Sequence, residues 1–494
     1  MSAERFNFAA AVPPVADLGV VHLIAVGGSG MSGVARMLLA AGCVVSGSDQ
    51  QPSSTLRELA AEGAQVHLGH DAAHVGGADT VIVSGAVRET NPELAAARSR
   101  GLRVLHRAQG IAALLGGRDA VAVAGANGKT TTAAMLTHLL KGCGADPGYV
   151  LGSALLGGSN AALGTGPVVV EADESDGSFL AYRPRVAVVT NITADHLDFY
   201  GDLAGVRRAF RRFADTVGAG APDGLLVTSA DDPGTKALTR ELRELGRPVL
   251  TWGSSADADL VLDQVETGAA SGSTVLRCTR GLGPVKAGSE HRLEIPMPGR
   301  HNLHNAVAAL LAATAGLGQS IDTTVQSLAT FPGTRRRFER LGVAAGVEVV
   351  DDYAHNPDKV AAVVLAGRSA VRGAGRLIVV FQPHLYSRTR AFAEQFAAGL
   401  SGADVVVLLD VYGAREEPVP GVDSELIAQH LRAGRSSVAE VRVGNDPDSA
   451  PGELAALVRP GDLVLTVGAG DVTKVGPRLL LALGRSPNTT EETH

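Results

Sequence analysis

The strongest constraint on the fold of this chain is the segment A-V-A-V-A-G-A-N-G-K-T-T-T at residues 120–132. A buried strand runs into a glycine-rich turn, and Lys129 and Thr130 then begin a helix, which is the phosphate-cradling arrangement of a P-loop. The full G-x-x-x-x-G-K-T spacing would need glycine where the chain has Val123, so Gly125 starts a shorter turn. The segment predicts a nucleotide site in which Lys129 contacts β- and γ-phosphates and Thr130 holds Mg²⁺.

Short β-branched runs alternate with helix-like stretches along most of the chain, the pattern of parallel sheets with crossover helices. In the first part we predict strands at 20–26, 43–46 and 80–84 and helices at 31–41 and 55–62. In the middle we predict strands at 120–124, 168–171, 186–191 and 225–227, helices at 130–141 and 302–315, and an antiparallel β insertion between 252 and 298. In the last part we predict strands at 347–350, 377–381, 405–409 and 463–467.

The length of 494 residues exceeds what one hydrophobic core usually holds, so the chain is predicted to be an α/β protein of three domains. Residues 1–117 are predicted to form a Rossmann-like domain, 118–330 a central P-loop ATPase-like domain that carries the β insertion, and 331–494 a second Rossmann-like domain. The polar residues 485–494 are predicted to be a frayed tail.

Composition narrows the class of protein. A content of 45% hydrophobic and 19% charged residues excludes a disordered chain, and a net charge of −7 gives no basic field that would gather nucleic acid. The three cysteines form no C-x-x-C pair, which favours a reducing compartment. With no visible secretion signal and no apolar run long enough to span a bilayer, we expect a cytoplasmic protein without a membrane span.

A second glycine turn, G-S-G-M-S-G at residues 28–33, follows the first predicted strand, and Asp49 ends the second. This pattern is the dinucleotide fingerprint, in which the acid binds a ribose. From the residues alone, three interpretations stay open: NAD, another nucleotide held by its diphosphate, and a turn with no ligand.

Acidic residues follow two strands of the middle part. E-A-D-E-S-D at 171–176 concentrates negative charge at a strand end, which favours Mg²⁺ over a solvated acidic loop. T-N-I-T-A-D-H-L-D at 190–198 adds His196, interpreted either as a second metal ligand or as an ordinary loop histidine. The spacing of His67, His70 and His74 resembles a zinc site, but a structural zinc is disfavoured because three ligands of one kind stand alone there.

Four further motifs lie downstream: G-R-H-N at 299–302, R-R-R-F-E at 335–339, D-D-Y-A-H-N-P at 351–357 and Q-P-H-L-Y-S-R-T-R at 382–390. The arginine run is either a solvated basic stretch or a cluster that neutralises charge in phosphoryl transfer. The last two motifs follow predicted strands, where open α/β sheets bind ligands.

Together these motifs occur in the same order as in the Mur ligases, and the chain resembles that family over residues 20–471. The resemblance implies an ATP-dependent ligase of peptidoglycan biosynthesis that joins L-alanine to the lactyl carboxylate of UDP-N-acetylmuramate through an acyl phosphate. It implies that the first domain holds the UDP-sugar, the central domain ATP, and the third domain the adenine side and the amino acid. The alternative within the family is a recycling ligase that joins a murein tripeptide to the same sugar nucleotide. The expected oligomeric state is monomer or dimer.

Carried over by motif, the resemblance assigns roles to individual residues. The UDP-sugar is expected to contact Gly28, Gly30, Met31, Gly33, Asp49, His70, Ser84 and Arg107. ATP is expected to contact Gly125, Ala126, Asn127, Gly128, Lys129, Thr130, Thr131, Asn302 and Arg337. Two Mg²⁺ ions are expected on Thr130, Glu171 and His196, and the amino acid on His384 and Arg388. The catalytic set is expected to be Lys129, Glu171, His196, Arg337, Asp351, Asp352, His355 and Arg388.

The chain departs from the family pattern in one consequential place. P-H-R-Y is the family motif, and Leu385 replaces its arginine here, which leaves glycine and serine open as acceptors beside alanine. Two functions of other classes were weighed. A nicotinamide-dependent dehydrogenase leaves the P-loop unexplained, and a catalytically silent ATP-binding regulator is disfavoured because Lys129, Glu171 and His196 are all present.

Overall fold

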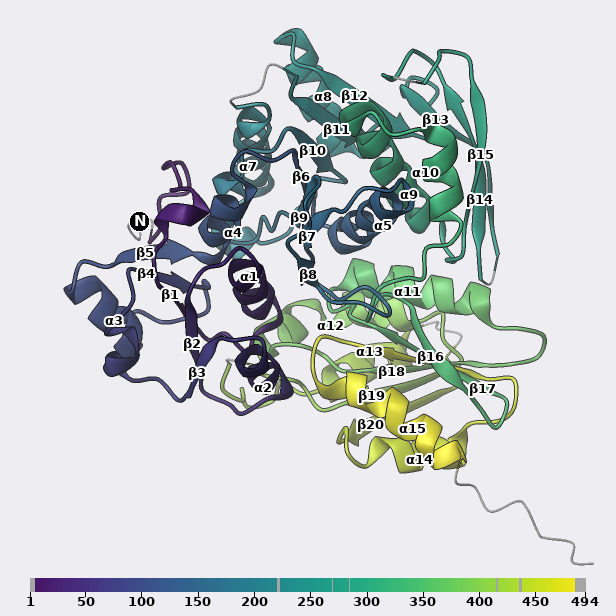
Figure 1. Cartoon of the computed structure of the whole chain (residues 1–494). Coiled ribbons are helices and arrows are strands. Elements are labelled where there is room, and N and C mark those ends of the chain that lie inside the picture. The colour runs from purple at the N-terminus through teal and green to yellow at the C-terminus, as the bar shows by residue number, and fades with distance from the viewer. Residues whose placement is uncertain are drawn as a thin grey trace, which may run out of the picture. The chain divides into compact units, whose positions relative to one another are not determined.

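The computed structural model describes residues 5–219, 223–268, 270–283, 285–414, 416–434 and 438–484. Most of the first 332 residues form one compact unit, and residues from Gly333 onward make up most of a second. The predicted α/β class is confirmed, since three sheets with intervening helices account for the fold (Figure 1). The domain boundaries at 117/118 and 330/331 remain predictions, and the polar segment 485–494 lies outside the described residues.

The first sheet of unit 1 has five parallel strands in the order β3-β2-β1-β4-β5, with β1 at its centre. Its strands are β1 (Val21–Ile24), β2 (Val45–Asp49), β3 (Gln65–Leu68), β4 (Thr80–Val83) and β5 (Arg103–His106). Its helices are α1 (Ser29–Ala40), α2 (Ser54–Ala61), α3 (Pro92–Ser99) and α4 (Arg107–Leu115), with short 3-10 turns at Val15–Asp17 and Ala72–Val75.

The second sheet of unit 1 has ten strands in the order β15-β14-β13-β12-β11-β10-β6-β9-β7-β8. The strands are β6 (Ala120–Ala124), β7 (Gly148–Val150), β8 (Ala161–Ala162), β9 (Val168–Glu171), β10 (Val186–Val189), β11 (Leu225–Ser229), β12 (Val249–Gly253), β13 (Leu260–Thr267), β14 (Gly272–Cys278) and β15 (Glu290–Ile295). The predicted β insertion corresponds to β13, β14 and β15, which continue this sheet beyond β12. Adjacent strands β13 and β14 are joined too closely for a parallel crossover, as expected of an antiparallel hairpin.

Within the described residues, six helices belong to this second part, and a π-helical turn follows the fifth of them, α9. They are α5 (Lys129–Gly142), α6 (Leu197–Tyr200), α7 (Leu203–Thr216), α8 (Pro233–Glu244), α9 (Arg300–Leu311) and α10 (Ile321–Leu328), with a 3-10 turn at Ser178–Ala181 and a π-helical turn at Ala312–Gly316. Strand β6, which feeds the P-loop, lies between β10 and β9 and is buried along its whole length.

Unit 2 is a six-stranded sheet in the order β16-β17-β21-β18-β19-β20, parallel except for the β16–β17 pair. Its strands are β16 (Glu339–Ala344), β17 (Val347–Asp352), β18 (Leu377–Phe381), β19 (Val405–Leu409), β20 (Glu440–Asn445) and β21 (Leu463–Val467). Its helices are α11 (Pro357–Ala370), α12 (Tyr386–Leu400), α13 (Glu425–Ala433), α14 (Ala450–Leu457) and α15 (Val475–Gly484), with a 3-10 turn at Asp471–Lys474.

Three helices begin with the same local device, an Asx residue followed by proline. Asn91, Asp232 and Asn356 cap α3, α8 and α11, and each side chain accepts a hydrogen bond from a backbone N–H of the first turn. Proline at the next position costs no hydrogen bond, because a backbone N–H in the first turn has no acceptor inside the helix. Two of these helices, α8 and α11, begin within a few residues of the ends of β11 and β17. None of the described helices is long and apolar enough to cross a membrane.

Candidate functional site

The residues predicted to bind the UDP-sugar lie along one edge of the first sheet, in the order of its strands. His70 follows β3, Asp49 ends β2, the glycine turn follows β1, and Ser84 and Arg107 come after β4 and at the end of β5, respectively. In a parallel sheet this carboxyl edge is where ligands bind. The structure therefore brings these predicted residues to one edge.

The glycine turn after β1 has little room for side chains. A Cβ on Gly30 would lie 2.5 Å from Nη1 of Arg107, and one on Gly33 would lie 3.1 Å from the Cβ of Ala161 in β8. The Asp49 carboxylate accepts a hydrogen bond from the backbone N–H of Gly27 at 2.9 Å and so ties β2 to the turn. The predicted ligand Met31 is different, since its side chain is 3% exposed and packs in the core, which leaves only its backbone for a ligand.

Arg107 lies between the glycine turn and the acidic loop of the second sheet. Its Nη2 is 3.9 Å from Oδ2 of Asp173, while its Nη1 faces Gly30. The neighbouring His106 is buried, with Nε2 3.4 Å from Oδ2 of Asp176. Burial lowers the pKa of His106 to about 4, against the opposing effect of Asp176, so the imidazole is neutral at physiological pH. Residues 106 and 107, at the end of the first sheet, thus lie close to the acidic loop that follows β9 of the second sheet.

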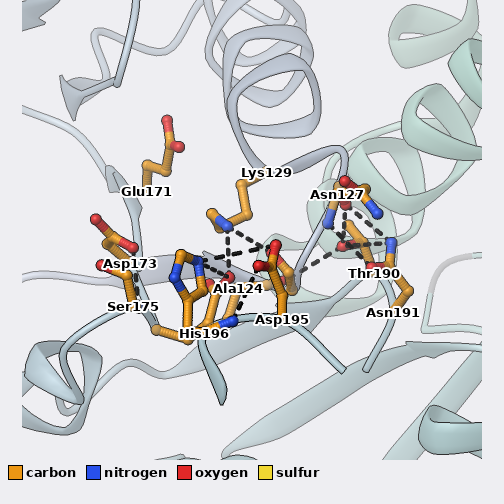
Figure 2. A network of polar contacts seen from close by, with 12 residues as sticks. Ala124, Asn127, Lys129, Glu171, Asp173, Ser175, Thr190, Asn191, Asp195 and His196 are labelled. Atoms are coloured by element: carbon orange, nitrogen blue, oxygen red, sulfur yellow. Dashed lines mark hydrogen bonds and ion pairs between the residues drawn. The ribbon is translucent and has the colours of Figure 1, made fainter. Parts of the chain in front are cut away.

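The P-loop is fixed by two residues after β10 that the sequence did not single out as ligands (Figure 2). Asn191 accepts from the backbone N–H of Asn127 at 3.0 Å and donates to the carbonyl of Asn127 at 2.9 Å. The Thr190 hydroxyl donates to the same carbonyl at 2.6 Å. Gly125 and Gly128 have φ of +130° and +88°, which glycine adopts at little cost. These contacts keep the turn in the shape that presents backbone N–H groups to phosphate.

Gly125 supplies a testable prediction about this turn. A Cβ there would lie 2.1 Å from Oγ1 of Thr190, so Gly125→Ala is expected to lower the free energy of unfolding by about 2–3 kcal/mol and to weaken ADP binding. Gly144→Ala is the matched control, because Gly144 also has a positive φ, +80°, but nothing lies within 4 Å of its Cβ position. Its expected cost is about 1 kcal/mol, with ADP affinity unchanged. Urea unfolding and calorimetric ADP titration measure both, and equal effects of the two variants would contradict the prediction.

Lys129, the first residue of α5, is held by a carboxylate that was not among the predicted site residues. Its ammonium donates to Oε1 of Glu174 at 2.9 Å and to the carbonyl of Gly125 at 2.6 Å. Burial lowers the pKa of Lys129, but Glu174, Asp173 and Glu171 outweigh burial and raise it above the usual value. Lys129 is therefore fully charged. Glu174 occupies the ammonium group in this structure, where a nucleotide phosphate would compete for it. The only sequence signal for Glu174 was its place in the acidic run 171–176.

The predicted magnesium ligands are brought together in part. Thr130 Oγ1 donates to Oε1 of Glu171 at 2.9 Å, and the other carboxylate oxygen accepts from the backbone N–H of Gly152 at 2.8 Å. His196 is turned toward other acids, with Nε2 4.0 Å from Oε1 of Glu174 and 3.9 Å from Oδ2 of Asp195 (Figure 2).

The surroundings nevertheless suit a divalent cation. Within the described residues, no group of three or more His, Cys, Asp and Glu side chains is already arranged to hold a metal ion. The hydroxyl and carboxylate oxygens of Thr130 and Glu171 are the ligand type that Mg²⁺ prefers. The buried Oε2 of Glu174 has no hydrogen-bond partner among the described atoms, and burial raises the pKa of this carboxyl. A bound cation would compensate this concentration of negative charge.

Asn302, the predicted adenine contact, is buried in α9 near the P-loop helix. Its Oδ1 accepts from Nδ2 of Asn305 at 3.5 Å, and Oδ1 of Asn305 accepts from the Thr132 hydroxyl at 3.3 Å. A Cβ on Gly128 would lie 2.4 Å from that same Asn305 oxygen. The predicted contact is thus linked to the phosphate turn by Asn305, which the sequence did not indicate.

Two predicted catalytic acids of unit 2, Asp351 and Asp352, accept hydrogen bonds from hydroxyl and backbone N–H groups of the protein itself. Asp351 is 1% exposed and accepts from the hydroxyls of Thr466 at 2.5 Å and Thr473 at 2.9 Å. Asp352 accepts from the backbone N–H groups of Phe338 and Ala354, each at 2.8 Å. Burial raises the pKa of Asp352 despite these contacts. Both carboxylates therefore organise the strand end around them.

Two members of the arginine run of unit 2 pack their guanidinium groups over the ring of Tyr353, Arg336 at 4.7 Å and the predicted member Arg337 at 5.3 Å. Arg336 also lies 3.6 Å from Asp351.

The remaining predicted residues of unit 2 form one group at the ends of β17 and β18. The ring centroids of His355 and His384 are 6.0 Å apart, and Arg388 donates to the carbonyl of His355 at 3.4 Å. Burial lowers the pKa of His355 to about 3, so its imidazole is neutral. Leu385, at the departure from the family motif, has a φ of +71° and is the N-cap residue immediately before α12. The structure thus brings His355, His384 and Arg388 together, while their roles stay predictions.

Comparison with known families identifies the class of protein that this fold and site define. The model described as "Mur ligase family, catalytic domain" matches residues 20–118, the "Mur ligase middle domain" matches 123–313, and the "Mur ligase, glutamate ligase domain" matches 336–470. The chain therefore belongs to the Mur ligase family, and the resemblance seen in its motifs is confirmed. It is an enzyme of an ATP-dependent ligase family.

Individual relatives are similar over nearly the whole chain. The UDP-N-acetylmuramate–L-alanine ligase of Kineococcus radiotolerans is 52% identical, over 95% of this chain and 98% of that protein. The enzyme of the same name from Thermobifida fusca is 48% identical over the same shares of the two chains. Among solved structures, UDP-N-acetylmuramate-alanine ligase from Thermotoga maritima superposes with a TM-score of 0.77 at 29% identity, covering 94% of this chain and 98% of that one.

Proposed function

We propose that this enzyme joins L-alanine to the lactyl carboxylate of UDP-N-acetylmuramate, giving UDP-N-acetylmuramoyl-L-alanine, ADP and phosphate in peptidoglycan biosynthesis. The observation that carries the proposal is the 52% identity, over 95% of this chain, to a relative named for that activity. The site gives further support, because unit 1 contains a P-loop lysine, an acidic strand end whose ligands suit a divalent cation, and a second glycine turn at the carboxyl edge of a parallel sheet.

The reaction has two steps, phosphoryl transfer to the carboxylate and then formation of the amide bond. A lactyl carboxylate oxygen attacks the γ-phosphorus of ATP, and the bond from that phosphorus to ADP breaks, which gives an acyl phosphate. The neutral amine of alanine then attacks the acyl carbon, and the tetrahedral intermediate expels phosphate as the amine loses its proton. Activation is needed because the carboxylate itself offers only a poor leaving group to the amine.

Unit 1 would supply the phosphate chemistry. The ammonium of Lys129 would leave Glu174 for the β- and γ-phosphates and neutralise charge as the phosphoryl group transfers. The backbone of the turn from Gly125 to Gly128 would hold the phosphates, and Asn302 would contact the adenine. Thr130 and Glu171 would hold Mg²⁺, with His196 as the proposed ligand of a second ion. Metal held by these residues would supply positive charge to offset the charge of the phosphates.

The edge of the first sheet would hold the UDP-sugar, with the diphosphate on the glycine turn after β1. Asp49 and His70 lie on the β2–β3 side of that turn, which is the side that binds the nucleoside in such sheets. Ser84 and Arg107 lie on the other side, toward the sugar. In unit 2, His384 and Arg388 are proposed to bind the amino acid and Arg337 to contact the nucleotide. Asp351 and Asp352 would act indirectly, by holding the strand end around them. The amine proton would pass to a carboxylate or to His355, whose imidazole is neutral but a weak base because burial lowers its pKa to about 3.

The test is release of phosphate from ATP by the purified full chain. We expect release only when UDP-N-acetylmuramate, Mg²⁺ and L-alanine are present together, and mass spectrometry of the product should show one added alanine residue. Glycine and L-serine, offered separately, measure how far Leu385 relaxes the choice of amino acid. A murein tripeptide as acceptor should give no release, and activity with the tripeptide but not with alanine would contradict the proposal.

A further inference from the structure

Glu93, in the first turn of α3, is a fully buried carboxylate that the proposed reaction does not use. It is 0% exposed, and its two oxygens hold different partners. Oε2 accepts from the Ser48 hydroxyl at 2.5 Å and from Nδ1 of His70 at 3.0 Å. Oε1 accepts from Nδ1 of His74 at 2.7 Å and lies 3.7 Å from Nε2 of His22. One buried charge therefore connects groups from β1, β2 and the segment after β3.

These contacts fix where the imidazole protons lie. Burial raises the pKa of Glu93, but its contacts with His22, Ser48 and His74 outweigh burial and lower it to about 2, so the carboxylate is ionised at neutral pH. An ionised carboxylate accepts hydrogen bonds and cannot donate them. His70 must therefore carry a proton on Nδ1, and in its neutral form Nε2 is left with a lone pair. The Ser48 oxygen, 3.0 Å from the same Nδ1, accepts from it as well.

His70 is placed beside the proposed nucleoside site. The backbone N–H of Gly69 donates to the carbonyl of Asp49 at 2.8 Å, which ties the start of this segment to the end of β2. Asp49 in turn holds the glycine turn through Gly27. With the diphosphate on that turn and the acid after the second strand on the ribose, His70 lies one strand further from the diphosphate. Uridine carries hydrogen-bond donors in this region, namely the ribose hydroxyls and the imide N–H of the base.

We propose that Glu93 is a positioning residue for the uridine nucleotide: it holds His70 in the Nδ1–H tautomer, so that Nε2 accepts a hydrogen bond from the uridine moiety. This inference rests on the proposed function, because the ligand is the uridine nucleotide of that reaction. Glu93 itself touches no substrate and acts only through His70. The arrangement gives the buried charge a role, because an apolar side chain in its place would leave the His74 N–H without this partner and His70 with the Ser48 oxygen alone.

Glu93→Gln is the direct test, with UDP and ADP as separate probes in calorimetric titrations of the full chain. The amide can donate as well as accept, so it no longer dictates the tautomer of His70. We expect UDP affinity to fall about ten-fold, the size of one lost hydrogen bond, and ADP affinity to stay unchanged. Nitrogen-15 NMR of the histidine rings, with His70 assigned by the His70→Gln spectrum, should show the proton on Nδ1 in the wild-type chain and a mixture in Glu93→Gln.

His74→Asn is the matched control, because it disturbs the same buried cluster through the other carboxylate oxygen. Oε1 loses its bond to His74, whereas the bond from Oε2 to His70 is kept. We expect a lower free energy of unfolding but UDP affinity within about two-fold of the wild-type value. A ten-fold loss of UDP affinity in His74→Asn would show that loosening of the cluster explains the effect, and would overturn the proposal.

Further outcomes separate this inference from the function on which it rests. A wild-type His70 with its proton on Nε2 overturns the inference without any variant. UDP binding by the wild-type chain together with equal binding by Glu93→Gln overturns the inference alone. Absence of UDP binding by the wild-type chain overturns the proposed function as well.

Two analogues identify the donor on the ligand. CDP lacks the imide N–H, and 2′-deoxyuridine diphosphate lacks one ribose hydroxyl. If the difference between wild type and Glu93→Gln disappears with CDP, the base donates to His70. If it disappears with the deoxy analogue, the ribose donates. A difference that persists with both analogues leaves the 3′-hydroxyl as the donor, and one that persists with 3′-deoxyuridine diphosphate as well contradicts a hydrogen bond from the uridine moiety to Nε2.

Discussion

Lys129→Met is expected to lower the rate of phosphate release by about 10³-fold and to leave UDP affinity unchanged. The ammonium lies at the start of α5, where it meets Glu174 and the carbonyl of Gly125. In the reaction it would stabilise charge on the transferring phosphoryl group, which methionine cannot do although it fills a similar volume. The UDP edge belongs to another sheet and makes no use of this side chain. Phosphate release and UDP titration measure the two expectations.

The variant also leaves the buried Glu174 without its cation. Burial already raises the pKa of Glu174, so in Lys129→Met this carboxyl is expected to take up a proton, with some loss of stability. Thermal unfolding distinguishes that loss from the loss of turnover. Lys141→Met is the control on the same helix, because Lys141 is exposed and its ammonium lies over the Tyr149 ring. Turnover in Lys129→Met equal to that of the control would refute the role assigned to Lys129.

Central strands of the sheets could be predicted from the sequence far better than their outermost strands. Apolar runs at 168–171, 377–381, 405–409 and 463–467 coincide with β9, β18, β19 and β21. Strands that were not predicted include β3, β5, β16 and β20, which end the five-stranded and six-stranded sheets. In the ten-stranded sheet they include the end strand β8 and the internal strands β7 and β12, and of β12 only the last two residues were expected to be extended. An edge strand has one side open to solvent, so its sequence needs no continuous apolar run. Gln65–Leu68, with its mixed polar and apolar residues, is an example.

The two glycine turns that precede α1 and α5 could be located from the sequence, because glycines between a strand and a helix form a local pattern. That they bind phosphate stays a prediction. The buried partners Glu93 and Glu174 could not be located in this way. Each is an acid within a short polar stretch, and nothing local distinguishes it from a solvated side chain. Its role depends on groups 45 residues away, Ser48 for Glu93 and Lys129 for Glu174, which only the fold brings into contact. The same limit explains Met31, whose motif predicts a ligand contact while the packing of α1 buries its side chain.

Glu171→Gln is expected to raise the Mg²⁺ concentration needed for half-maximal phosphate release and to lower turnover by about 10²-fold even at saturating Mg²⁺. The carboxylate ends β9 and bonds to the Thr130 hydroxyl and to the backbone N–H of Gly152. Glutamine has the same shape and can keep a hydrogen bond to each of these groups, so the turn should stay folded. What it lacks is the negative charge that a divalent cation requires of its ligand.

A magnesium titration of ADP binding tests this charge directly. In the wild-type chain Mg²⁺ should strengthen ADP binding, and in Glu171→Gln this strengthening should be largely lost, while ADP binding without metal should rise because one repelling charge near the phosphates is gone. Glu241→Gln is the control, since Glu241 is an exposed partner of Arg211 in the same unit. The opposite signs of the two expected changes exclude a simple loss of folding, which would weaken ADP binding under both conditions. Identical Mg²⁺ dependence in Glu171→Gln and the control would remove Glu171 from the metal site.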